Sequence, residues 1–245
     1  MSNVDDVLQR LIARFERRVD LDDADREALR TLPYRPMTFE PGKYIVREGG
    51  PAPTACLILS GLAYRHKLTP DGSRQIVSIH IAGDFVDLEG VLLKTADHNV
   101  QALTRCESAL IPAPAIIDLI DTHPRIARAM WIDTLVDGSI FREWIVNVGR
   151  RDARARLAHI FCEFALRLEA AGVTHGDGYE FPMTQEQLAD ASGLTPVHVN
   201  RTLKPMTAEG LVTRNKRFVT IPDWERLRSV AGFSELYLHR DLLAS

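Results

Sequence analysis

The stretch from residue 195 to residue 222 gathers side chains that could bind a polyanion. It contains five basic residues and a single acid, Glu209. Guanidinium and ammonium groups grouped in this way bind phosphate oxygens, and arginine can also form two parallel hydrogen bonds to one flat partner. The net charge of the whole chain is only −3, so charge alone leaves a solvated surface as the alternative. The five are Arg201, Lys204, Arg214, Lys216 and Arg217.

Two short helices joined by a glycine turn are predicted to carry these side chains. Thr184 begins the first helix as its N-cap, with Gln187 completing a capping box, and Gly193 ends it. Thr195 and Pro196 start the second helix, because proline at the first helical position loses no hydrogen bond. The second helix is predicted over residues 195–209, and a helix-turn-helix of this kind places it in the major groove of DNA.

The outer face of the second helix is the predicted contact surface. Val199 and Leu203 point inward at a four-residue spacing, and Pro205 should kink or shorten the helix. Residues 212–221 predict a β-hairpin wing whose tip, residues 214–217, suits phosphates. The residues left facing outward are Val197, His198, Asn200, Arg201 and Lys204.

Upstream, residues 34–112 predict an antiparallel roll or barrel of β-strands, preceded by a helix over residues 3–31. Short runs rich in Val, Ile, Leu and Tyr alternate with turns that contain Pro and Gly. The predicted strands are residues 37–39, 44–46, 56–59, 62–68, 75–81 and 100–111.

Residues 124–149 predict a helix about 39 Å long. Its apolar residues cover more than one face, so the helix must be buried on two sides. One side can pack on the roll and the other on the same helix of a second subunit; burial wholly inside one chain is the alternative. Residues 151–171 predict another helix, and residues 175–179 predict a hairpin turn. Residues 224–243 predict a helical tail that packs back on the body, with a second dimer contact as its alternative.

These motifs resemble those of the Crp/Fnr family of bacterial regulators over roughly residues 30–222. The segment GDFV, at residues 83–86, is similar to the segment that precedes the short pocket helix in this family. The segment LADASGLTPVHVNRTL, at residues 188–203, is similar to the family's recognition motif. The resemblance implies an α+β chain with an N-terminal antiparallel β-roll, like the cyclic-nucleotide-binding jelly roll, a long dimerisation helix and a C-terminal winged helix-turn-helix. The expected domains are residues 1–122, 123–149 and 150–245.

The resemblance further implies a transcription regulator that binds a palindromic operator in double-stranded DNA as a homodimer, with RNA polymerase as a partner if it activates. Arg201 matches the family's base-reading arginine. Val197 stands where a glutamate is usual and could touch a thymine methyl, and Asn200 could pair with an adenine edge. The implied contacts to the DNA backbone are Thr184, Thr195, His198, Lys204, Arg214, Lys216 and Arg217, and the implied dimer-helix residues are Met130, Leu135 and Trp144.

The signal sensed by the roll is not identified by the sequence. Members that bind cyclic AMP carry a Gly-Glu pair and an Arg-Ser pair, where this chain has Asp87-Leu88 and, near the second pair, Asp97-His98. These four residues are the effector-pocket candidates. Because two carboxylates would repel a cyclic phosphate, cyclic AMP is not expected.

No cofactor is predicted. An iron–sulfur centre needs four thiolates, whereas the chain has three widely spaced cysteines, which are expected to be core thiols in a reducing cytoplasm. Haem would need an axial histidine, and no pattern supports one. No Cys/His spacing supports a metal site. The cysteines are Cys56, Cys106 and Cys162, and the histidines considered are His66, His80 and His98.

Two other functions stay open at this point. One is a sensor module whose helix-turn-helix serves protein contacts, which Val197 and Pro205 favour and which Arg201 argues against; the other is a regulator that responds to a cyclic nucleotide. An enzyme is not expected, because the nucleophile elbow, the phosphate-binding loop and the dinucleotide-binding glycines are missing. Without a bilayer-spanning apolar run or a signal peptide, a cytoplasmic location away from the membrane is expected.

Overall fold

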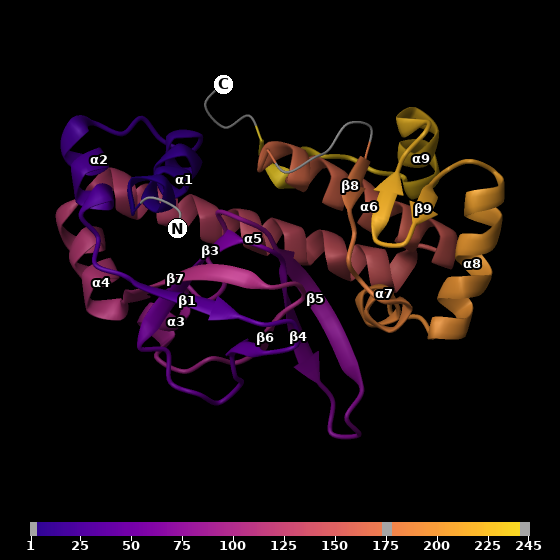
Figure 1. Cartoon of the computed structure of the whole chain (residues 1–245), viewed down its shortest axis with the longest axis horizontal. Helices are drawn as coiled ribbons and strands as arrows, with labels where there is room; N and C mark the ends of the chain where they lie inside the picture. Colours follow the sequence, from indigo (N-terminus) through magenta and orange to yellow (C-terminus); the bar gives the residue numbers. More distant parts are fainter. Residues whose placement is uncertain (1–3, 173–177, 241–245) are drawn as a thin grey trace. The chain divides into compact units, whose positions relative to one another are not determined.

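The computed structural model describes residues 4–172 and 178–240, and within them the chain forms two compact units (Figure 1). The first unit holds residues 4–65, 79–139 and 238–240, and the second holds residues 66–78 and 140–237. The division falls inside a long helix, α5 (Pro124–Arg150), so this single element contributes residues to both units.

Two sheets form the predicted β-roll. In one, β7 lies between β1 and β3 and runs antiparallel to both; in the other the order is β2-β6-β4-β5, with β2 antiparallel to β6. Small and apolar side chains fill the space between strands, among them Cys56, Ile58 and Val100. The strands are β1 (Arg35–Phe39), β2 (Tyr44–Val46), β3 (Thr54–Ser60), β4 (Ala63–Leu68), β5 (Arg74–His80), β6 (Asn99–Ala102) and β7 (Cys106–Pro112).

The strand predicted over residues 100–111 is two strands, and this prediction is corrected. The N–H groups of Leu103 and Thr104 both donate to the carbonyl of Leu62, at 2.7 and 3.1 Å, and the Thr104 hydroxyl accepts the N–H of Leu62 at 2.9 Å. These contacts turn the chain between β6 and β7 and send the two strands to different sheets. An apolar run alone does not reveal such a turn.

The helix predicted over residues 3–31 is likewise two helices, α1 (Val4–Glu16) and α2 (Asp23–Arg30); residue 3 lies outside the described residues. The Asp22 carboxylate accepts the N–H of Asp25, and the Asp25 carboxylate accepts the N–H of Asp22. This reciprocal cap satisfies backbone donors at the start of α2 and favours a new helix over a continuous one.

Buried ion pairs fix α1 in the first unit. Arg14 Nη1 lies 2.6 Å from Asp84 Oδ1, and Arg14 Nε lies 2.5 Å from Asp133 Oδ2 on α5. Burial would lower the pKa of Arg14, but the two carboxylates outweigh it and the pKa is raised. Asp84 therefore neutralises a buried cation. Two further helices, α3 (Gly90–Leu93) and α4 (Ala113–Thr122), complete the unit.

The long predicted helix is present as α5, and two of its three predicted dimer residues are buried in their own chain. Met130 belongs to the core of the first unit, and the Trp144 indole N–H donates to both carboxylate oxygens of Glu163 at 3.1 and 3.0 Å. Leu135 is 55% exposed, as are Trp131 at 68% and Ile145 at 67%. The choice of Met130 and Trp144 is corrected, because helical periodicity does not say which apolar stripe meets its own core.

The second unit is assembled on α6 (Ala153–Ala170), whose predicted apolar face is buried. Of the hairpin turn predicted at residues 175–179, residues 175–177 lie outside the described residues, and so do residues 241–243 of the tail. As far as residue 237 the tail does pack back: α9 (Trp224–Ala231) contacts α6, and the Tyr237 hydroxyl donates to Glu163 at 2.7 Å. The predicted helix is shorter than expected, because Gly232 ends it in a left-handed conformation. The remaining elements are β8 (Gly178–Glu180), α7 (Gln185–Ser192), α8 (Pro196–Ala208), β9 (Thr213–Asn215), β10 (Phe218–Thr220), α9 (Trp224–Ala231) and η1 (Leu236–Leu238).

Within the described residues, the helices are too short or too polar for any of them to cross a membrane.

Candidate nucleic-acid interface

The first helix of the predicted helix-turn-helix, α7, has the caps that the sequence indicates. The N–H of Gln187 donates to the Thr184 hydroxyl at 3.1 Å, and the N–H of Thr184 donates to Gln187 Oε1 at 2.9 Å. Gly193 follows the helix with a φ of 63°, a left-handed conformation that glycine adopts at little cost. The caps and the glycine together fix where α7 stops and where the chain turns.

An arginine from α6 fastens this turn. Arg156 Nη1 donates to the carbonyl of Ser192 at 3.0 Å, and Arg156 Nε donates to the carbonyl of Arg151 at 2.8 Å. The Ser192 hydroxyl in turn donates to the carbonyl of Leu188 at 2.7 Å. No local pattern in the sequence indicates this role for Arg156, because it lies 36 residues before the carbonyl that it holds.

The second helix, α8, is fixed at both ends, so it presents a rigid outer face. The Thr195 hydroxyl accepts the N–H of His198 at 3.2 Å, and Val199 beneath it is fully buried. At the other end, Glu209 accepts two hydrogen bonds from Arg154 of α6, at 2.7 and 2.5 Å. The hydrogen bond from Arg154 is the largest cause of a lowered pKa at Glu209. The predicted bounds of residues 195–209, caps included, are confirmed.

Pro205 lies inside α8 without ending it. The helix continues to Ala208, and the N–H of Glu209 donates to the Pro205 carbonyl at 2.9 Å. Proline has no N–H to give to the carbonyl four residues earlier, which here belongs to Arg201. The predicted shortening is therefore not observed, although one hydrogen bond of the helix is missing.

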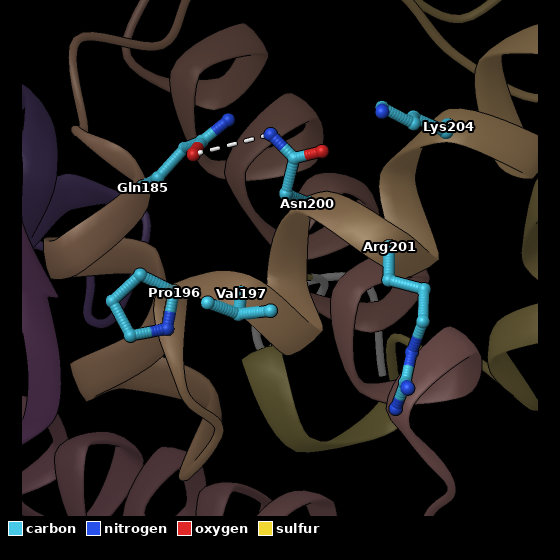
Figure 2. Close-up of a pocket in the computed structure, with 6 residues that line it drawn as sticks. All are labelled: Gln185, Pro196, Val197, Asn200, Arg201 and Lys204. Carbon is cyan, nitrogen blue, oxygen red and sulfur yellow. Dashed lines mark hydrogen bonds between the residues drawn. The ribbon is translucent and has the colours of Figure 1, made fainter.

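The outer face of α8 lines an open hollow of about 450 Å³, shown in Figure 2. Val197 is 78% exposed, and Arg201 and Lys204 are also exposed. Among the described residues, neither cation has a hydrogen-bond or ion-pair partner. The Asn200 amide donates to Gln185 of α7 at 3.4 Å, a neighbour that the sequence had not singled out. The predicted base-reading set, Val197, Asn200 and Arg201, therefore lies on one surface with Lys204.

Two threonines and a histidine predicted to hold the DNA backbone belong to the N-terminal ends of the same two helices. Thr184 and Thr195 are exposed as the caps of α7 and α8, and His198 is half-buried on the first turn of α8. Helix N-termini attract anions because their first N–H groups point outward and the helix dipole is positive there.

The predicted wing is present, but its three cations differ. β10 pairs with both β8 and β9, and Lys216 turns the chain with a φ of 56°. Lys216 and Arg217 are exposed. Arg214 is half-buried; its Nη2 donates to the Met183 carbonyl at 2.7 Å, and burial lowers its pKa. Lys216 and Arg217 are thus available to a phosphate, whereas Arg214 already holds the wing to its own unit.

The first unit brings together two of the four effector-pocket candidates. Asp87 and His98 are buried, and one ligand atom of each lies within 4.8 Å of the other and of Glu89. Asp97 is exposed and contacts His98, while Leu88 packs against the core. Burial, reinforced by the negative charge of Glu89, raises the pKa of Asp87 to about 7.

A buried arginine that the sequence had not indicated lies beside these side chains. Arg65 Nη2 donates to the Val86 carbonyl at 2.8 Å and lies 2.9 Å from Glu89 Oε1. A guanidinium group could hold a cyclic phosphate, but this one is paired with a carboxylate of its own chain.

Comparison with known proteins agrees with both units. The family description of a cyclic nucleotide-binding domain matches residues 36–123, and that of a Crp-like helix-turn-helix domain matches residues 155–230. The transcriptional activator protein FnrL of Cereibacter sphaeroides is 27% identical over 216 residues, which cover 85% of this chain and 86% of FnrL. The nitrogen fixation regulation protein FixK of Bradyrhizobium diazoefficiens is 28% identical over 200 residues, which cover 81% of this chain and 82% of FixK.

A solved structure shows the same fold. FixK2 from Bradyrhizobium japonicum superposes with a TM-score of 0.74 at 21% identity, covering 83% of this chain and all of that one. A β-roll joined through a long helix to a winged helix-turn-helix defines a class of DNA-binding transcription regulators, and this chain is one of them. It belongs to the Crp/Fnr family.

Proposed function

We propose that the chain acts as a homodimer on a palindromic operator, with α8 of each subunit in the major groove. The observation that carries this proposal is the outer face of α8, where Arg201 and Lys204 are exposed without partners among the described residues beside an exposed Val197. Arg201 can fork onto guanine O6 and N7, and Val197 can contact a thymine methyl. A surface for protein contacts would have no need of unpaired cations.

The homodimer would form along α5. Trp131 and Leu135 are 68% and 55% exposed, and Ile145 is 67% exposed. At 3.6 residues per turn these three lie within a narrow arc of one helix, the pattern expected of a helix that packs on its own copy. A homodimer with a two-fold axis has the same symmetry as a palindrome, whose half-sites lie about one DNA turn apart.

The effector of the β-roll is proposed not to be a cyclic nucleotide. The effector-pocket candidates include the buried carboxylate of Asp87, and the guanidinium of Arg65 that could meet a phosphate is paired with Glu89. Bringing a cyclic phosphate here would place like charges together in a site of low dielectric. RNA polymerase is the proposed partner of the DNA-bound dimer, by analogy with FnrL, which is named as a transcriptional activator.

Selection of bound fragments from random duplex DNA, with and without cyclic AMP, tests these proposals. We expect a palindromic consensus that is the same in both conditions. A consensus found only with cyclic AMP would refute the pocket argument. Enrichment in neither condition, in low salt as well as in physiological salt, would contradict DNA recognition by the isolated homodimer.

Two arginine variants sharpen the test. Arg201→Ala is expected to lose about 1–3 kcal/mol of discrimination at one base pair of each half-site. Arg217→Ala, at the wing tip, is the matched control: it should weaken binding to all sequences alike and reduce the salt dependence. An unchanged consensus in Arg201→Ala would remove Arg201 from the base-reading set.

A further inference from the structure

The β-roll contains a group of metal-ligating side chains that DNA recognition does not use. Asp87 and Glu89 lie just before α3, and His98 lies just before β6. One ligand atom from each of the three lies within 4.8 Å of the others. Asp87 is 3% exposed and His98 is 4% exposed, so two of the three groups have exchanged water for the protein interior.

Polar atoms in this group have no protein partner. Asp87 Oδ1 and His98 Nε2 are buried, and neither makes a hydrogen bond to any residue that the structure describes. Leaving a buried donor or acceptor unsatisfied costs about 1–3 kcal/mol, and more when the group is charged, so native proteins rarely do so without a reason such as a bound ion. Two such atoms in one cluster point to a ligand between them.

The surroundings of His98 match those of a metal-binding histidine. Its Nδ1 lies 2.7 Å from Asp97 Oδ1. A proton on Nδ1 that is donated to this carboxylate leaves the lone pair on Nε2, the nitrogen without a partner. Metal-bound histidines commonly donate the N–H of their other ring nitrogen to a carboxylate in this way, which fixes both the tautomer and the ring orientation.

The two carboxylates are held in place as well. A side chain at Gly90 would put its Cβ 2.7 Å from each Asp87 oxygen, so glycine is what lets the carboxylate lie against the start of α3. Arg65 holds Glu89 Oε1 at 2.9 Å. When both carboxylates are ionised, they and the single guanidinium of Arg65 leave a net negative charge, which a cation would offset.

We propose that Asp87, Glu89 and His98 bind one divalent transition-metal ion in the β-roll. One imidazole and two carboxylates suit Mn²⁺, Fe²⁺, Co²⁺ or Zn²⁺, whereas Mg²⁺ and Ca²⁺ favour sets of oxygen ligands alone. Three protein ligands also leave coordination positions open for water or a small molecule. The sequence predicted no metal here because the ligands follow no Cys/His spacing and meet only when the chain folds.

Isothermal titration calorimetry of Zn²⁺ into the metal-free full chain tests the proposal. A second titration with Co²⁺, monitored by the visible absorption of the bound ion, provides another readout. We expect one ion per chain, retained in excess Mg²⁺. Asp87→Asn and His98→Gln should each weaken Zn²⁺ binding by at least about a hundredfold. His123→Gln is the control: it removes the histidine at the C-cap of α4 and should bind Zn²⁺ as the wild type does. If the wild type binds no Zn²⁺, or if His98→Gln binds Zn²⁺ as tightly as the wild type does, the proposed site is wrong.

Asp97→Asn tests the same site with a variant that is expected to fold even if Asp87→Asn or His98→Gln does not. The Asp97 side chain is 88% exposed, so its loss should leave the roll intact while freeing the His98 ring. We expect Zn²⁺ affinity to fall by about 10–100-fold, the usual effect of losing the partner of a metal-bound histidine. Unchanged affinity would contradict the orientation of His98 argued above. None of these measurements uses DNA, so their failure is distinguishable from failure of the proposed operator binding.

Discussion

The three cysteines illustrate how burial decides the chemistry of a side chain. All three are free and buried. Burial raises the pKa of Cys56 and of Cys162 to about 12 and that of Cys106 to about 11, so the nucleophilic thiolate is scarce at neutral pH. The sequence-based interpretation as core thiols agrees with these environments.

We therefore predict that a thiol reagent such as Ellman's reagent reacts with fewer than one thiol per folded chain within minutes at pH 8. All three thiols should react once the chain is unfolded in guanidinium chloride. Rapid reaction of one cysteine in the folded protein would reopen a redox role, and replacing each cysteine by serine in turn would identify it.

Glu143 should make stability depend on pH in the acid range. A hydrogen bond with His159 is the largest cause that lowers the pKa of Glu143 from 4.5 to about 2, and Arg151, 2.5 Å away, adds to the effect. A lowered carboxylate pKa means that the unfolded state binds the proton more readily. Its stabilisation is thus complete above about pH 4.5 and is lost as the pH falls towards 2.

We predict that Glu143→Gln lowers the free energy of unfolding by roughly 1–3 kcal/mol at pH 7 and by much less near pH 2. Urea denaturation at a series of pH values measures the difference. A gap between variant and wild type that stays constant from pH 7 to pH 2 would show that packing, rather than charge, accounts for the effect of Glu143.

Among the elements, α8 combines strong end signals with an internal defect. The caps at Thr195 and Glu209 are satisfied, yet Pro205 removes the hydrogen bond to the Arg201 carbonyl. Proline in a helix interior costs about 3 kcal/mol relative to alanine, and part of this is offset because proline restricts the unfolded chain. Pro205 is exposed, so packing does not compensate further.

Pro205→Ala is accordingly expected to raise the free energy of unfolding by about 1–2 kcal/mol, measured by urea denaturation. Thr207→Ala, an exposed substitution on the same turn of the helix, is the control and should stay within about 0.5 kcal/mol of the wild type. A destabilised Pro205→Ala would mean that the proline ring makes a contact that α8 needs.

The elements that sequence patterns located best are those with local signals. The bounds of α7, α8 and the wing follow from caps, a glycine and a basic turn, each of which acts over a few residues. The break between α1 and α2 depended on a local signal too, the Asp22 cap, but the apolar spacing on either side masked it. The turn at Leu103–Thr104 was out of reach, because its partner is a carbonyl about 40 residues away, in Leu62.

Side-chain clusters were less accessible to sequence analysis. Asp87 and His98 were candidates, but nothing local indicated that Arg65 from β4 would face Glu89. On α5, the apolar spacing predicted more than one apolar face, and burial of the second face against another subunit stays a prediction. The spacing could not tell that Met130 and Trp144 face their own chain while Trp131 and Leu135 remain exposed. Which face packs inward is decided by the tertiary structure.

At the scale of the whole molecule, these exposed residues of α5 lead to the last prediction. Large apolar side chains exposed to water on one helix favour association, because burying each of them lowers the free energy of the system. The wild-type chain, with a mass of 27.5 kDa, should therefore elute as a species of twice that mass in light scattering after gel filtration. Leu135→Glu would place a charge in the apolar contact and should shift the species to the monomer.

Ile117→Glu provides the matched control, since Ile117 is an exposed apolar residue of α4, 39% exposed, and lies off α5. It should remain a dimer with the same melting temperature as the wild type. Because a monomer meets only one half-site at a time, Leu135→Glu should also lose most of its affinity for a palindrome while keeping the same half-site preference. If Leu135→Glu stays dimeric and binds the palindrome as the wild type does, the dimer contact must lie elsewhere than on this face of α5.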